Sequence, residues 1–450
     1  MAIVVTGDSP HLYVHTVSLP SPIPVAQRIP PHATAVWLHG HGGFVALGHA
    51  RRLEASGPGR FADLARDFAD LTRRARVRDD VRSRGTGLIA FGSFSYADNS
   101  PRPSRLLIPR AILGTIDGAS FLTVISDTDT GPLTRHGIEA ALAEYTPTAE
   151  FPPTPGAARH PSEMTPAHSA DSYRALVATA VDRINRGDAQ KIVLSERFTV
   201  DLDGEGPRPL LPSLARHLNA RYRGAWTFHI DDIIGASPEM LVRTDAGAIF
   251  SRVLAGSRPV AGDGSLNEHD RRAFLADPKE RAEHDYAVRS VAEPLARLTD
   301  DLSVSPTPFV LQLPGLEHLA SDITGRLASG VGLLDVAEAL HPSAAVSGTP
   351  REVANAIIAD LEGVDRGGYA APVGWIGGAG DGEWAIALRM AHVGEDSLTI
   401  QAGGGLVTGS DPLTEHAEAL AKTRPIMSAL AATDRPGSPR PGAPAHPDTP

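Results

Sequence analysis

The chain has 450 residues, of which 42% are hydrophobic and 21% charged, which is enough apolar material for one large domain or two to three ordinary ones. It contains no cysteine, which excludes disulfides, thiolate nucleophiles and cysteine-based zinc sites. Its formal net charge of −11 argues against nucleic-acid binding, and with neither a signal-like N-terminus nor an apolar run of about 18 residues we expect a cytoplasmic protein without a membrane span.

The first third of the chain carries short apolar stretches broken by Gly and Pro, such as GTGLIAFGSFSY, so we expect residues 1–150 to form a β-rich part of the fold. One helix is predicted within it at 59–75, where apolar residues recur at helical spacing. Residues 151–166 are rich in Pro and are predicted to be a loop. Residues 434–450 are dominated by Pro and Gly, and we expect a disordered tail.

Residues 167–433 mix helical and strand-like periods without regular alternation, which favours an α+β fold over a doubly wound sheet. Helical spacing predicts helices at 169–188, 279–298, 331–340, 350–362 and 411–430. Strand-like composition predicts strands at 190–200, 226–244, 248–260, 309–327, 372–378, 383–393 and 397–410. Asp411 is the predicted N-cap of the last helix, because Pro412 suits the first helical position.

Two of the predicted helices each carry a pair of glutamates three residues apart. Glu280 and Glu283 form one pair, Glu415 and Glu418 form the other, and Lys422 lies one turn beyond Glu418. Spacing alone favours two solvated faces, with a Glu418–Lys422 ion pair worth about 0.3–0.5 kcal/mol. If the two helices converge, a hard cation such as Mg²⁺ would relieve the repulsion between the carboxylates.

Nine motifs in order, from about Asp171 to Ala431, resemble those of the chorismate-utilising enzymes: QKIVLSE, GASPEMLVR, LAGSRP, KERAEHDYAV, HPSAAVSGTP, GGYAAPVGWIG, EWAIALRMA, IQAGGGLVTGSDP and EHAEALAKTR. They span well over half of the chain. The resemblance implies one large α+β domain, with two packed, antiparallel-rich sheets in the centre and helices outside. Residues 167–433 would then be the chorismate-binding core, with Mg²⁺ as the cofactor and the small molecule chorismate as the substrate.

The resemblance also turns the glutamate pairs into a metal site. Glu283 and Glu418 match the residues that hold Mg²⁺, whereas Glu280 and Glu415 match neighbours that act partly through water. The positions expected to bind the substrate are Gly256, Ser257, His341, Ala345, Tyr369, Arg389, Gly403, Gly404 and Lys422.

Some of these positions carry a more specific expectation. Arg389 matches an arginine that binds the enolpyruvyl carboxylate, and its apolar neighbours favour this role because a desolvated guanidinium needs an anion. Lys422 matches a lysine that meets a substrate carboxylate. The main-chain N–H groups of Gly403 and Gly404 are expected to approach the substrate, since glycine lets the backbone come close. His341 matches a histidine near the active site and receives no assigned role.

The resemblance implies that two further residues carry out the reaction. Family members that add water at ring carbon 2 resemble this chain in having lysine at the position of Lys191, whereas ammonia-using members have glutamine there. A lysine can take a proton from water only where burial or nearby positive charge favours its neutral form. Glu239 matches the general acid that protonates the departing 4-hydroxyl, and apolar surroundings would keep such a carboxyl protonated.

Ala345 stands where salicylate- and anthranilate-forming relatives tend to have threonine, which favours stopping at isochorismate. Isochorismate synthase is therefore the expected activity. Salicylate synthase is the first alternative, an ammonia-using synthase is less favoured, and a non-catalytic metal- or anion-binding protein is least favoured. We expect a monomer without a glutaminase subunit, and the sequence leaves open whether the product serves menaquinone or siderophore synthesis.

Overall fold

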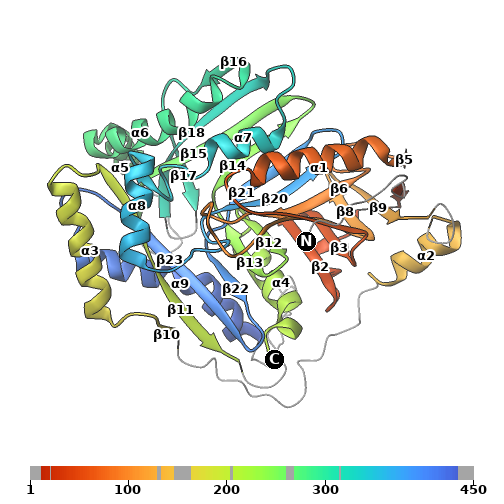
Figure 1. Cartoon of the computed structure of the whole chain (residues 1–450), viewed down its shortest axis with the longest axis horizontal. Coiled ribbons are helices and arrows are strands. Elements are labelled where there is room, and N and C mark those ends of the chain that lie inside the picture. The colour runs from red at the N-terminus through yellow and green to blue at the C-terminus, as the bar shows by residue number, and fades with distance from the viewer. Residues whose placement is uncertain are drawn as a thin grey trace, which may run out of the picture.

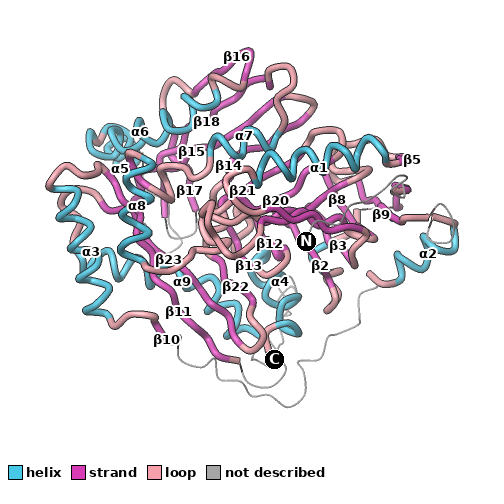
Figure 2. Tube along the Cα trace, viewed as in Figure 1, coloured by secondary structure: helices cyan, strands magenta, loops and turns pink. Residues whose placement is uncertain are grey.

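The computed structural model describes residues 12–20, 22–128, 133–145, 164–202, 206–259, 268–313 and 316–433. Two large sheets form the centre of the molecule, and helices lie around them (Figures 1 and 2). The α+β prediction with two central, antiparallel-rich sheets is therefore confirmed. The predicted tail 434–450 and most of the predicted loop 151–166 lie outside the described residues.

The first sheet has 13 strands within the described residues, and only β1 and β5 run parallel to each other. Its strands in spatial order are β10 (Thr165–Pro166), β11 (Lys191–Asp201), β23 (Ser397–Leu406), β22 (Met390–Val393), β13 (Ile233–Ser237), β12 (Trp226–Ile230), β2 (Ala33–His39), β3 (Gly42–Leu47), β8 (Ala111–Ile116), β9 (Ala119–Ser126), β1 (Tyr13–Leu19) and β5 (Arg76–Asp79), with β19 (Gly348–Thr349) beside β11.

The second sheet has 10 strands in the same described ranges. Their spatial order is β16 (Thr299–Val304), β18 (Leu316–Leu327), β15 (Ala248–Pro259), β14 (Met240–Asp245), β21 (Gly382–Ile386), β20 (Pro372–Gly377), β6 (Ile89–Ser93), β7 (Ser104–Ile108) and β4 (Arg51–Ala55), with β17 (Phe309–Leu313) beside β18. In both sheets, N-terminal strands pair directly with strands of the C-terminal part, through β2–β12 and β6–β20. The described strands of the N-terminal part therefore belong to the same two sheets as the strands of the C-terminal part.

The helices cover the outer faces of this core. They are α1 (Arg60–Arg74), α2 (Arg135–Ala143), α3 (Ala170–Asn185), α4 (Leu211–Arg221), α5 (Glu268–Ala276), α6 (Pro278–Leu295), α7 (Leu333–Leu340), α8 (Arg351–Glu362) and α9 (Pro412–Thr433), with short 3-10 turns at Val25–Gln27 and Arg208–Leu210. The main-chain N–H of Thr414 donates to the Asp411 carboxylate at 2.9 Å, which confirms the predicted N-cap. Within the described residues, no helix is both long and apolar enough to cross a bilayer.

The predicted helices at 59–75, 169–188, 279–298, 331–340, 350–362 and 411–430 are all confirmed. The predictions missed α2, α4 and α5, although α4 carries leucines at 211, 214 and 218 with helical spacing. The single strand predicted at 383–393 was wrong. It consists of β21 and β22, which belong to different sheets because the chain crosses between the sheets at Ala387–Arg389.

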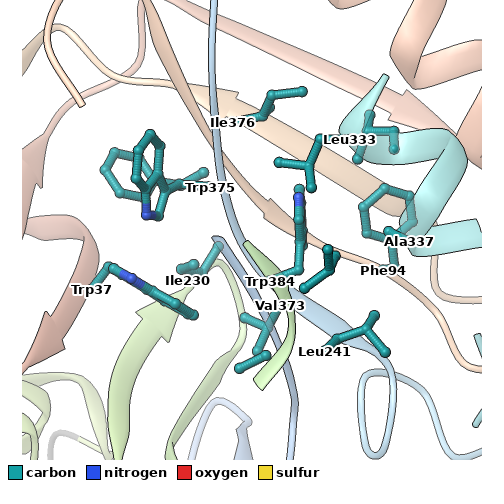
Figure 3. Close-up of a cluster of buried hydrophobic side chains, with 14 of the residues drawn as sticks. Trp37, Phe94, Ile230, Leu241, Leu333, Ala337, Val373, Trp375, Ile376 and Trp384 are labelled. Carbon is teal, nitrogen blue, oxygen red and sulfur yellow. The ribbon is translucent and has the colours of Figure 1, made fainter. Parts of the chain in front are cut away.

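Large aromatic side chains fill the space between the two sheets (Figure 3). Trp37 comes from the first sheet, Trp375 and Trp384 come from the second, and each is at most 2% exposed. The Trp37 indole also donates to the Glu383 carboxylate at 3.1 Å, which links the sheets directly. Truncating such a buried aromatic typically costs about 3–5 kcal/mol, so this cluster holds the two sheets in fixed relative positions.

Candidate active site

Glu239 and Arg389 lie where the chain passes from one sheet to the other. Glu239 lies between β13 of the first sheet and β14 of the second, and Arg389 lies between β21 of the second and β22 of the first. The two crossings are hydrogen-bonded to each other: the Ile386 N–H donates to the Glu239 carbonyl at 3.0 Å, and the Ala236 N–H donates to the Arg389 carbonyl at 3.2 Å. Two residues far apart in sequence are thereby fixed at one junction.

The backbone at this junction is tightly constrained. Arg389 has a φ of 49°, in the left-handed region that side-chain-bearing residues adopt rarely. Opposite it, a Cβ on Gly235 would lie 2.6 Å from the Met390 Cβ and 2.9 Å from the Arg389 carbonyl oxygen. Only glycine fits there, so the close approach of the two crossings depends on Gly235. An unusual backbone conformation at an otherwise well-packed position is typical of functional sites.

The Glu239 carboxyl is held in a weakly solvated place. Burial raises the pKa of Glu239 to about 7, against the opposing positive charges of Lys191, Arg389 and Lys422. Within the described part of the chain, its carboxylate forms neither an ion pair nor a hydrogen bond. Desolvation therefore dominates over three nearby cations, and the group can carry a proton at neutral pH.

The Arg389 guanidinium forms no hydrogen bond or ion pair with any residue that the structure describes. Burial lowers the pKa of Arg389 below its ordinary value, and the nearby Tyr369 and Glu418 act in the opposite direction. A partly buried arginine without a carboxylate partner among the described residues is available to bind an anionic group of a ligand.

Lys191 begins β11, where it pairs with Thr349 of β19. Its side chain runs across the neighbouring strand β23: a Cβ on Gly405 would lie 2.7 Å from the Lys191 Cε and 3.3 Å from its Nζ. Any side chain at position 405 would displace the lysine. The sequence predictions did not single out Gly405, although it lies in the same glycine run as Gly403 and Gly404.

Three charged side chains of α9 lie close to Gly404 of β23. A Cβ on Gly404 would lie 3.2 Å from Glu415 Oε2, 3.7 Å from Glu418 Oε1 and 3.7 Å from Lys422 Nζ. Burial raises the pKa of Glu415, and the negative charge of Glu418 adds to this effect. Glu415 and Lys422 are therefore partly buried against the sheet, whereas the side chain of Glu418 is 51% exposed.

Lys422 is tied to this position by two contacts. Its Nζ lies 2.6 Å from Glu418 Oε1 and donates to the Gly403 carbonyl at 2.7 Å. The intrahelical ion pair that spacing suggested is therefore formed. Burial lowers the pKa of Lys422 below its ordinary value, although Glu418 opposes this shift. At Gly403, a Cβ would lie 2.0 Å from the Leu194 carbonyl oxygen, so this glycine is required by the close approach of β11.

Glu280 of α6 lies against the second sheet. A Cβ on Gly256 of β15 would lie 2.9 Å from Glu280 Oε2, so this end of α6 lies directly over Gly256. His284, one turn further along α6, makes hydrogen bonds with the Ala255 carbonyl at 3.1 Å and with Ser321 Oγ at 2.8 Å. These two contacts fix α6 against β15 and β18. The side chains of Glu283 and Ser257, both predicted site residues, lie outside the described residues.

His318 of β18 connects the two halves of the site, and the sequence predictions missed it. Burial lowers the pKa of His318 to about 4, and the positive charges of Arg389 and Lys422 act in the same direction. A main-chain hydrogen bond with Gly256 and the charge of Glu418 oppose this shift. His318 therefore lies next to Gly256, and its pKa also responds to the charges on α9. The only signal was a histidine within the predicted strand segment LEHLASD.

The remaining predicted positions are placed as follows. Tyr369 is buried, burial raises its pKa to about 12, and it acts electrostatically on Arg389. Ala345 lies in the loop between α7 and β19.

His341 makes a hydrogen bond with the Tyr96 carbonyl at 2.9 Å, and burial lowers the pKa of His341 to about 3, so its imidazole is neutral. His341 lines a separate cleft of about 720 Å³ that neither Lys191 nor Glu239 lines.

A buried ion pair links two backbone segments that carry predicted site residues. Arg366 and Glu362 are joined at 2.6 Å, and Glu362 also accepts from the N–H and hydroxyl of Ser195 on β11. Arg366 donates to the Val193 carbonyl at 2.7 Å and to the Val346 carbonyl at 2.8 Å. One guanidinium thus connects the strand that carries Lys191 with the loop that carries Ala345.

Comparisons with known proteins agree on one family. A family model described as "Chorismate binding enzyme" matches residues 31–431. The chain belongs to the chorismate-binding enzyme family. The chain is 31% identical over 409 residues to the salicylate biosynthesis isochorismate synthase of Pseudomonas aeruginosa, covering 86% of this chain and 83% of the relative. It is 29% identical over 367 residues to the isochorismate synthase MenF of Bacillus subtilis, covering 78% and 76%.

A solved structure extends this agreement to the fold of chorismate-binding enzymes. The menaquinone-specific isochorismate synthase MenF of Escherichia coli superposes with a TM-score of 0.75 at 21% sequence identity, covering 94% of this chain and 95% of that one. At this identity the likeness concerns the architecture alone.

The acidic residues of this chorismate-binding enzyme fit a hard divalent cation in their chemistry. Glu415 and Glu418 are carboxylates held close together, and Gly404 leaves the space beside them free of a side chain. Oxygen ligands of this type suit Mg²⁺. Among the described residues, no three Asp, Glu or His side chains are grouped closely enough to hold a metal, and Glu283 is outside that set. The Mg²⁺ site remains a prediction.

The composition contained a further signal that the sequence analysis did not use. Only three of the 42 basic residues are lysines, namely Lys191, Lys279 and Lys422. Where nearly all other basic residues are arginine, a lysine indicates a position that needs a compact ammonium group, or a basic group that can lose its proton. Two of the three lie in the site.

Proposed function

We propose that this chorismate-binding enzyme is an isochorismate synthase, which isomerises chorismate by adding water at ring carbon 2 and losing the hydroxyl at carbon 4. The observation that carries the proposal is the Glu239 carboxyl. Burial raises its pKa to about 7, so it can donate a proton near neutral pH, and a general acid works best with a pKa close to the working pH.

In this mechanism Lys191 takes a proton from the attacking water, and Glu239 gives its proton to the departing hydroxyl, which leaves as water. One proton enters the protein at Lys191 and one leaves at Glu239, so the reaction is balanced once both groups exchange with solvent. The electrostatic coupling between Lys191 and Glu239 supports a shared site for the two groups.

The binding roles follow from the charges. The unpaired Arg389 would hold one substrate carboxylate, and Lys422, with the main chain of Gly403 and Gly404, would approach the other. Glu280, Glu283, Glu415 and Glu418 would hold Mg²⁺. When bound, the metal would neutralise these carboxylates and attract the negatively charged substrate. Gly256 and Ser257 would line the same cleft, next to Glu280.

Relatives named isochorismate synthase support this activity over the alternatives, as does lysine at position 191 instead of the glutamine of ammonia-using synthases. Ala345 supports release of isochorismate without further elimination. A salicylate synthase, which would also eliminate pyruvate, is the second candidate, because one relative is named for salicylate biosynthesis. We further propose that the chain acts as a monomer and without a glutaminase subunit.

Product analysis tests the proposal. Purified protein is incubated with chorismate and Mg²⁺, with and without ammonium, and the products are separated by chromatography while lactate dehydrogenase reports pyruvate. Isochorismate without pyruvate is the expected result. Salicylate with stoichiometric pyruvate would establish the second candidate, and anthranilate formed only with ammonium would overturn the assignment of water as the nucleophile.

A further inference from the structure

A cleft of about 600 Å³ lies between the C-terminal half of α6 and the loop that follows α7. Figure 1 shows α6 and α8 on the same side of the molecule, and this loop connects α7 to α8. Three arginines line the cleft: Arg289 on α6, Arg297 just beyond its end, and Arg351 at the start of α8. Glu293 is the only acidic residue among the described residues that line the cleft, which carries three arginines in a chain of net charge −11.

Within the described residues, none of these three arginines forms an ion pair with an Asp or Glu. Arg289 lies over the Tyr286 ring at 4.7 Å, and Arg351 donates to the His341 carbonyl at 3.1 Å. An acidic protein offers many carboxylates for pairing, and Arg252, for example, is paired with Asp322 at 2.6 Å. Three unpaired arginines around one cleft form an anion receptor.

A second, independent feature of the cleft concerns Ser343. Its side chain is 8% exposed, and its buried hydroxyl has no hydrogen-bond partner within the described structure. Buried hydroxyl groups are normally satisfied by protein, water or ligand, because an unmade hydrogen bond costs free energy. Ser343 lines the same cleft, together with Ser290 and Thr349. Ser343 thus places a buried hydroxyl, without a partner among the described residues, in the wall of the cleft that carries the three arginines.

We propose that this cleft is a second anion-binding site, which takes a small molecule carrying two or more negative charges on carboxylate or phosphate groups. Each guanidinium offers a planar pair of N–H donors that matches such oxygen atoms. Glu293 can offset one of the three positive charges, which leaves a surplus that suits a multivalent anion. The Tyr286 ring adds an apolar wall against which the body of the ligand can pack.

The site is distinct from the candidate active site but shares structure with it. Lys191, Glu239 and Arg389 do not line the cleft. Thr349, which lines the cleft, pairs with Lys191 across β19 and β11, and Ala344 directly precedes Ala345. A ligand in the cleft would thus contact the outer side of the loop whose other residues belong to the proposed chorismate site. Binding itself does not depend on the proposed function.

Titration calorimetry with the full chain tests the inference. The probes are succinate and inorganic phosphate, at a low ionic strength held constant with sodium chloride. We expect saturable, one-to-one binding of at least one probe outside the catalytic site. Binding of succinate alone would identify a carboxylate site, phosphate alone a phosphate site, and both a general oxyanion site. No saturable binding of either probe would overturn the inference.

Variants locate the bound anion. Arg289→Gln with Arg297→Gln removes two exposed side chains and should weaken binding at least about tenfold. Ser343→Ala should weaken it without any change in charge. Arg82→Gln with Arg135→Gln removes the same charge from the N-terminal part of the chain and should leave affinity unchanged. Equal weakening in this control would contradict a specific site.

One further variant separates this cleft from the proposed active site. Arg389→Gln should retain the binding of the probe, because Arg389 lies outside the cleft. Loss of binding in Arg389→Gln, together with full binding in the Arg289/Arg297 double variant, would overturn the inference. Turnover of chorismate is measured for the double variant as a separate readout, so a failure of the proposed function leaves the binding result interpretable.

Discussion

Glu239 and Arg389 are 150 positions apart in the chain, yet they occupy two adjacent crossings between the sheets, and the charge of Arg389 lowers the pKa of Glu239. Burial overcomes this effect and holds the pKa at about 7. The junction thus places a carboxyl that can be neutral beside a guanidinium that lacks a partner. A proton donor and an anion-binding group are what a reaction on a carboxylate substrate with a poor leaving group requires.

The pH dependence of turnover tests the role of Glu239. Its raised pKa means that the acid form predominates below about pH 7 and is lost as the pH rises through that value. We expect kcat to fall on the alkaline side of about pH 7, approaching a tenfold loss per pH unit if Glu239 must be protonated. Steady-state rates across this range provide the measurement. A rate that stays level from pH 6 to about pH 8 would contradict the assignment.

Replacing Lys191 tests the base. Lys191→Ala should reduce kcat by about 10²–10⁴-fold, because the attacking water loses its proton acceptor, while chorismate still binds. Rapid-quench or steady-state assays give the rate, and calorimetry gives the affinity. Thr199→Ala, on the same strand but eight residues away, serves as the control and should keep its activity. Undiminished turnover in Lys191→Ala would refute the role of Lys191.

Removing the metal tests whether the glutamates of α6 and α9 bind a Mg²⁺ ion that the reaction needs. Excess EDTA should abolish turnover, and added Mg²⁺ should restore it. Glu415→Gln and Glu280→Gln should each weaken Mg²⁺ binding measured by calorimetry, because each removes a charged oxygen ligand. Asp285→Asn, at an exposed position of α6, removes the same charge without facing the site and should bind Mg²⁺ normally. Full activity in EDTA would eliminate the metal from the mechanism.

Replacing Arg389 tests substrate recognition. Arg389→Gln should weaken chorismate binding by about ten- to a hundredfold, since one charged hydrogen-bonding partner of a carboxylate is lost. Arg389→Lys should recover only part of that loss, because an ammonium group cannot bind a carboxylate in the same bidentate way. KM together with direct binding measurements distinguishes this effect from an effect on the chemical step. Unchanged affinity in both variants would count against the role.

The Arg366–Glu362 pair should be important for stability as well as for the site. Glu362→Gln leaves the buried Arg366 without its charge partner, and we expect a loss of about 3–5 kcal/mol in the free energy of unfolding. Denaturant unfolding provides the measurement. Asp360→Asn, which breaks the exposed pair with Arg183, should cost only about 0–1 kcal/mol. Similar costs for the two variants would show that the buried brace has no special role.

Much of the local structure was predictable because it depends on local periodicity. The helices α1, α3, α6 and α9 follow from apolar residues at helical spacing and from capping by residues such as Asp411. These features depend on residues within one or two turns of each other, so the sequence carries them directly. Lys191 and the glutamates of α6 and α9 were named as site residues through the resemblance to the chorismate-utilising enzymes, because spacing alone favoured solvated faces.

The convergence of the site was decided by tertiary structure alone. The segment 383–393 has one continuous apolar pattern, and nothing in that pattern shows that β21 and β22 join different sheets. That division depends on pairing with β14 and β13, which lie about 150 residues earlier in the chain. The same long-range pairing determines that Gly405 lies beneath Lys191, that His318 adjoins Arg389, and that burial raises the pKa of Glu239. Desolvation comes from the whole surrounding fold, so a local sequence can name a titratable residue but cannot set its proton affinity.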